Sequence, residues 1–227
     1  MWNNVIGHNR KNDDSMSPPN LFPKTMRQLC ICLLMTLCAL VPSFAQERSH
    51  TVDSILRTLN DEEKLNFYRA SKFSRYTDIA AQRTLYAHEY LTLSEKLQRK
   101  EDIGTARFLV VINEHDGTVI SANETVSRYL DVLRYLRSED ILSVQTPVLC
   151  FLGMTALDET RDIAFALEYS LQAVKSAREQ RDSARLGLAL NLVADAYLRS
   201  SNPQTALRYC KESLVVRESL PKGGYFS

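Results

Sequence analysis

The chain has 227 residues, of which 44% are hydrophobic and 24% are charged. This is enough to bury one sizeable core. Its 28 Lys and Arg nearly balance its 27 Asp and Glu. Because a balanced charge provides no electrostatic footprint for a phosphate backbone, we expect no nucleic-acid partner.

Residues 1–45 are predicted to lie outside the folded part. Residues 1–25 are polar and proline-containing, and we interpret them as a leader upstream of the true start, at Met26 or Met16. Residues 26–45 are predicted to be a signal peptide, since Lys24 and Arg27 give a basic start, residues 29–41 form an uncharged apolar run, and small residues precede a cut between Ala45 and Gln46. The sequence therefore predicts export, to the periplasm or the medium.

The apolar run is shorter than the roughly 20 residues that cross a bilayer. We therefore expect the segment to be cleaved, and the alternative is an uncleaved anchor. A membrane association is expected only through such an anchor or through a C-terminal region beyond this sequence.

The rest of the chain is predicted to be entirely helical, since Ala, Leu, Arg and Glu are abundant and no segment has the pattern of a clear strand. A short N-terminal helix is expected within residues 46–60, and a loose tail over 219–227. The helices expected between them cover about residues 61–73, 77–99, 102–116, 123–136, 138–158, 162–178, 182–199 and 202–219. The expected starts include Asn123 or Thr125, Ser138, Asp162, Asp182, and Asn202 followed by Pro203.

Tyrosines recur along this helical region at nearly equal intervals: Tyr90, Tyr129, Tyr169 and Tyr209. A small or apolar residue lies three positions before each tyrosine. Another residue that can pack on the same helical face lies four positions after it. The period, about 40 residues, is typical of a solenoid built from repeated units. We call this periodic alignment of the chain with itself the tyrosine register.

The stretch from Leu188 to Leu214 resembles a tetratricopeptide repeat, a pair of antiparallel helices that touch through small residues. Its first helix matches the family pattern at Leu190, Val193, Ala194 and Tyr197, and its second at Ala206, Cys210 and Ser213. The unit one period earlier matches well, and the two units before it match less well. The resemblance implies an all-α solenoid of about four such helix pairs over residues 61–218, with units longer than the usual length of about 34 residues.

The resemblance also implies a function. Long repeats of this kind behind a signal peptide are similar to the periplasmic sensor regions of some bacterial regulators. Two functions follow as expectations: a non-catalytic scaffold that binds a peptide or protein partner on its concave face, or the sensor portion of a membrane-anchored signalling protein. An enzyme with an α-toroidal fold is a third and weaker interpretation, because the sequence contains neither a set of inward carboxylates nor a histidine cluster.

In this family the first helices line the partner groove. The matching positions in the last unit are Leu188, Asn191, Asp195, Leu198 and Arg199, and in the preceding unit Val148, Phe151, Thr155, Asp158 and Glu159. We predict a partner-binding groove formed by Asn191, Asp195, Arg199, Thr155 and Phe151. The alternatives are a solvated stripe with an Asp195–Arg199 ion pair, and a core position for Phe151.

No motif in the sequence requires catalysis, a cofactor or a metal ion. The cluster Asn113 to Asp116 lacks metal-ligand spacing and is interpreted as a polar turn. Cys150 and Cys210 are predicted to be buried free thiols in the core, and a disulfide between them is the alternative.

Overall fold

The computed structural model describes residues 53–70, 80–116 and 120–220, and every regular element in these ranges is a helix. The predicted leader, the signal peptide with its cut between Ala45 and Gln46, and the tail beyond residue 220 lie outside the described residues. After a helical stretch at 53–58, the elements are α2 (Asp61–Ala70), α3 (Ala80–Lys96), α4 (Lys100–Asp116), α5 (Ala122–Ser138), α6 (Gln145–Thr155), the π-helical turn η2 (Ala156–Thr160), α7 (Ile163–Glu179), α8 (Ser183–Arg199) and α9 (Pro203–Glu218).

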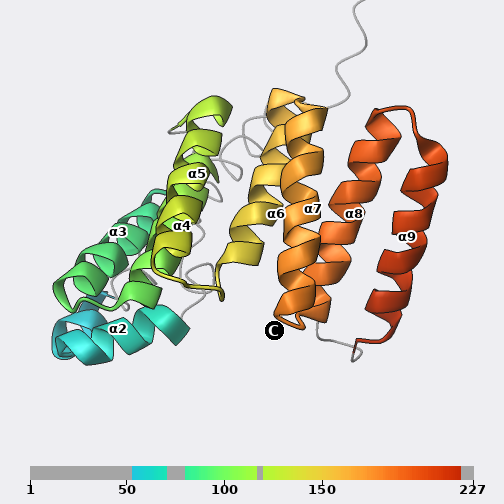
Figure 1. Ribbon diagram of the computed structural model, residues 1–227. Coiled ribbons are helices and arrows are strands. Elements are labelled where there is room, and N and C mark those ends of the chain that lie inside the picture. The colour runs from blue at the N-terminus through green and yellow to red at the C-terminus, as the bar shows by residue number, and fades with distance from the viewer. Residues whose placement is uncertain (1–52, 71–79, 117–119, 221–227) are drawn as a thin grey trace, which may run out of the picture. The chain divides into compact units, whose positions relative to one another are not determined.

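These helices form a solenoid-like row in which each one packs against the next in the chain (Figure 1). Helix α6 also contacts α8, two helices further on. The predicted all-α solenoid architecture is confirmed. Within the described ranges, no helix combines the length and the low polarity that crossing a membrane requires.

Polar residues cap the starts of α2, α7, α8 and α9. The side chains of Asp162, Asp182 and Asn202 accept hydrogen bonds from the backbone N–H three residues on, as their sequence positions predict. Asn60 and Glu63 exchange side chain to backbone bonds at the start of α2, at 2.8 and 3.0 Å. This reciprocal arrangement is a capping box.

Two predicted helix starts are wrong. Helix α5 begins earlier than expected, because Ser121 provides its cap by accepting from the Glu124 N–H at 3.3 Å. Ser138 is the last residue of α5 and not the cap of the next helix, since its hydroxyl donates to the Tyr135 carbonyl inside α5. Both segments contain several residues able to cap a helix, so composition alone does not choose between them.

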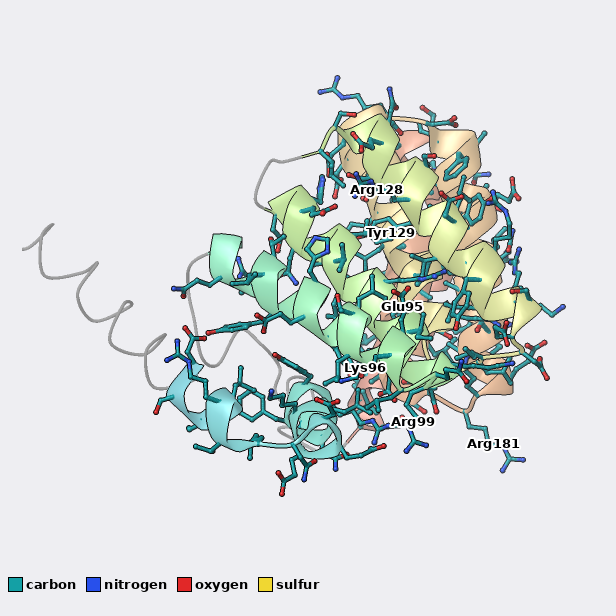
Figure 2. All side chains as sticks on the ribbon, turned by 90° about the vertical axis from the view of Figure 1, so that its left-hand side faces the viewer. Glu95, Lys96, Arg99, Arg128, Tyr129 and Arg181 are labelled. Atoms are coloured by element: carbon teal, nitrogen blue, oxygen red, sulfur yellow. The ribbon has the colours of Figure 1, made fainter. Side chains whose placement is uncertain are left out.

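The turns that follow the helices share one backbone conformation. Gln98, Asp140, Arg161, Arg181 and Ser201 have φ between 53° and 60°, the left-handed region, although none is glycine. The last three are evenly spaced in the sequence, so the same tight turn recurs along the C-terminal part of the row. Arg181 extends away from the helices at one such turn (Figure 2).

The repeated tyrosines lie on alternate helices: α3, α5, α7 and α9. Tyr90 and Tyr129 are buried, whereas Tyr169 and Tyr209 are partly buried. The small residues three positions before three of them, Ala87, Ala166 and Ala206, are buried as well. The periodic stripe in the sequence therefore faces the core.

The two described cysteines are free thiols, as predicted, but they differ in exposure. Cys150 is buried in the central core cluster. Cys210 is exposed, so its predicted core position is wrong. It lies four positions after the buried Ala206 and three before the buried Ser213, at the border of the packed side of α9.

Candidate functional site

One side of α4, α6 with η2, and α8 carries the candidate site, and we call it the first-helix face. On α8, the residues Arg185, Leu188, Asn191, Asp195 and Arg199 are spaced by three or four positions, which places them along one side of the helix. Leu188 is 41% exposed, so this side is accessible to solvent.

Arg199 links α8 to η2 at one end of this face. Its Nη2 lies 2.9 Å from the Asp195 carboxylate and 2.7 Å from that of Asp158, and its Nη1 donates to the Leu157 carbonyl. The hydrogen bonds from the guanidinium to Asp195 and Asp158 raise the pKa of Arg199. The predicted Asp195–Arg199 pair is present, and Arg199 additionally holds two helical elements together.

In the π-helical turn η2, two neighbouring carboxylates contact different helices. Asp158 faces α8, and Glu159 faces α4, where its carboxylate lies 2.7 Å from Nε2 of His115. Turns of this kind occur often at functional sites. His115, Glu159, Asp158, Arg199 and Asp195 form a line of charged and polar groups across three successive first helices, which we call the polar row.

A cavity of about 660 Å³ lies at the other ends of the same helices. Arg185 of α8, Pro147 of α6, and Thr105 and Phe108 of α4 line it, together with Arg69, Tyr90, Glu101, Asp102, Leu109, Ser143 and Val144. This volume falls in the range of small-molecule and peptide side-chain pockets. Its lining combines apolar, cationic and anionic groups.

A buried carboxylate stands in the wall of this cavity. Asp102 is only 6% exposed and accepts from Arg69 Nε at 2.7 Å and from the Tyr90 hydroxyl at 2.7 Å. Burial acts to raise the pKa of Asp102, but the hydrogen bonds from Arg69 and Tyr90 outweigh it, so the pKa is lowered. Burial and the bond to Asp102 raise the pKa of Tyr90.

One of the predicted groove residues, Thr155, is buried, and another, Phe151, is partly buried. Thr155 is 3% exposed and so is not available to a partner. The ring of Phe151 packs at 5.3 Å from that of Phe108 and 5.9 Å from that of Tyr129, as the core alternative expected. Asp195 and Arg199 are at the surface and in contact, and Asn191 is partly buried on the same side of α8.

The segment Asn113 to Asp116 is the last turn of α4 and not a solvated loop. Glu114 is buried and joins three helices, because it contacts His88 of α3 at 3.0 Å and Arg128 of α5. Figure 2 shows Arg128 on α5 beside Tyr129. Among the described residues, no group of three or more His, Cys, Asp or Glu is arranged to hold a metal ion.

Sequence reasoning misses Asp102, Arg69 and the link from His115 to Glu159. The sequence identifies Asp102 only as an acidic residue at a helix start. Its two partners lie on other helices, and a single sequence carries no signal for such a pairing. The tyrosine register places His115 at the position equivalent to Thr155 and Asp195, and this equivalence is a sequence signal for including His115 in the site.

Comparisons with known proteins assign no family to this chain. No protein-family model matches it, and no curated protein matches it significantly.

Proposed function

We propose that this protein is an exported, non-catalytic scaffold of the tetratricopeptide-repeat type that binds a peptide or protein partner on the first-helix face. The observation that supports the proposal is that α4, α6–η2 and α8 carry both a cavity of about 660 Å³ and the polar row. A ligand lying across these helices would meet a pocket lined by both apolar and charged side chains at one end and the polar row at the other.

The charged groups of the first-helix face are better suited to binding a peptide than to catalysing a reaction. Arg199 already satisfies two carboxylates and a carbonyl, and Asp102 is already satisfied by Arg69 and Tyr90. Such groups are held in fixed positions, which lowers the cost of ordering them on binding. The exposed Leu188 and Leu198 offer apolar contact area beside them.

The face is tested with paired variants. Leu188→Arg combined with Leu198→Arg changes two exposed side chains, 41% and 60% exposed, without touching the core. We expect peptides selected against the natural chain from a random library to bind this variant at least about tenfold more weakly, because apolar contact is replaced by bulk and charge. Fluorescence anisotropy with labelled peptides measures the change.

The matched control is Leu171→Arg combined with Leu142→Arg, which alters exposed leucines of α7 and of the segment before α6. Binding by the control should equal that of the natural chain. Equal loss in both variants, or no loss in either, would remove the first-helix face from the proposal. Arg199 is left intact because its removal would also release the Leu157 carbonyl.

Export is tested separately by mass spectrometry of the protein made in a bacterial host with a general secretion pathway. The signal in residues 26–45 predicts a mature chain that begins at Gln46. A chain that keeps residues 26–45 would support the anchored alternative and contradict cleavage.

A further inference from the structure

Helix α9, the last helix that the structure describes, carries an uncovered apolar surface. Leu207, Leu214 and Val215 are 55%, 56% and 67% exposed, and Cys210 is exposed between them. We call these four residues the α9 patch. The opposite side of α9 is well packed, since Ser213 donates to the Gly187 carbonyl at 2.8 Å and the Tyr209 ring stacks on that of Tyr197 at 5.7 Å.

Most of the corresponding surface of α7 is covered, although the counterpart of Val215 is the exposed Lys175. In the tyrosine register, Leu207 and Leu214 correspond to Leu167 and Val174. Leu167 packs in a cluster with Leu192 and Ala196 of α8, and Val174 is buried in the central core cluster. On α7 these two positions therefore contribute to helix packing, whereas the equivalent positions of α5, Ser127 and Arg134, are exposed. Helix α9 presents apolar side chains at them without a following helix in the described residues.

We propose that the α9 patch pairs with the α9 patch of a second copy of this chain, with the two helices antiparallel. Helices α7, α8 and α9 alternate in direction along the row (Figure 1). An antiparallel α9 from a second copy continues that alternation, so the two rows would join into one.

The patch is self-complementary about the centre of the helix. Helix α9 has 16 residues, from Pro203 to Glu218, and its midpoint falls between Cys210 and Lys211. Leu207 and Leu214 stand at equal distances from that midpoint. A two-fold axis there sets each Leu207 against Leu214 of the other copy, which is the same-patch contact that a two-fold dimer requires.

Charge acts in both directions in this arrangement. The same axis brings Glu218 beside the first residue, Pro203, of the other α9, and a carboxylate is favoured at the positively polarised N-terminus of a helix. Lys211 lies next to the axis in each copy, so the two exposed ammonium groups come near each other and weaken the pairing.

The expected dimer is weak. One pair of 16-residue helices, about 24 Å long, buries less than the roughly 800 Å² per partner of a standard interface. We expect a dissociation constant on the order of 10–100 μM, typical of small interfaces.

Sedimentation equilibrium of the full chain tests the proposal. From about 5 to about 500 μM, a range that spans weak interfaces, the mean mass should rise from monomer toward dimer. Leu207→Glu combined with Leu214→Glu should weaken the association at least about tenfold, because charge replaces the apolar contact. Leu142→Glu, at an equally exposed leucine outside the patch, should leave it unchanged. Circular dichroism of each variant checks that the helices are kept.

Cross-linking locates the contact. With Cys30, Cys32 and Cys38 replaced by Ser, a short bismaleimide should link two copies through Cys210 and not through the buried Cys150. Adding Cys210→Ser should abolish the link. A mass that stays monomeric over the whole range, or a dimer that survives the Leu207→Glu and Leu214→Glu changes, would overturn the proposal. A mass that stays monomeric would leave a helix of another protein as the expected partner of the α9 patch.

Discussion

Replacing Asp102 with Ala is expected to lower the free energy of unfolding by about 3 kcal/mol, because it dismantles a buried polar cluster. The Tyr90 hydroxyl would lose its buried hydrogen bond to the carboxylate, and a hydrogen bond to a charged group contributes about 1.5–3 kcal/mol. Arg69 is 45% exposed, so water compensates part of its loss. Urea unfolding followed by circular dichroism at pH 7 measures the change.

The pH dependence of this effect has a defined sign. Since the pKa of Asp102 is lowered in the folded protein, its contribution is fully present above the ordinary Asp value of about 3.9. It is lost as the pH falls through the lower folded-state pKa. The stability difference between the natural chain and the Asp102→Ala variant should be constant from about pH 5 to 8 and should shrink below about pH 4.

The control is an exposed carboxylate in an ion pair. Asp131 is 61% exposed and pairs with Arg134 along α5. Its replacement by Ala should change stability by no more than about 0.5 kcal/mol, because exposed pairs contribute little. A loss for Asp102→Ala as small as that for Asp131→Ala would mean that the buried cluster contributes no more than a surface pair.

Local signals in the sequence predict the helices and their order well. Asp162, Asp182 and Asn202 each accept a hydrogen bond from the backbone N–H three residues later. Such a short separation can be recognised in a single sequence. The tyrosine register likewise predicts which side of α3 and α5 is buried. The starts of α5 and α6 are missed where several cap residues compete.

Long-range pairings are not predictable from the same information. The register places Tyr90 and Tyr129 alike, yet the Tyr90 hydroxyl donates to Asp102 and the Tyr129 hydroxyl has no hydrogen-bond partner among the described residues. The exposure of Cys210 is not predictable from the register either. Its helical position matches the buried Ser170 of α7, which lies against Gly153 of α6, yet Cys210 is exposed.

The small residues at the helix contacts determine how closely the helices approach, and this leads to the second large expected effect. Gly153 of α6 lies against Ser170 of α7, and a Cβ added to it would stand 3.5 Å from the Ala166 carbonyl. Ala166 itself is fully buried.

Ala166→Leu should therefore destabilise the fold by about 2–3 kcal/mol, since three more carbons must enter a packed interface. Ala164→Leu, two residues earlier on the exposed side of α7, makes the same chemical change and should stay within about 0.5 kcal/mol of the natural chain. Thermal and urea unfolding of both variants compare them directly. If Ala166→Leu proved as stable as Ala164→Leu, close approach through small residues would not be what holds α6 against α7, and the stacking would have to rest on the larger side chains of the central core.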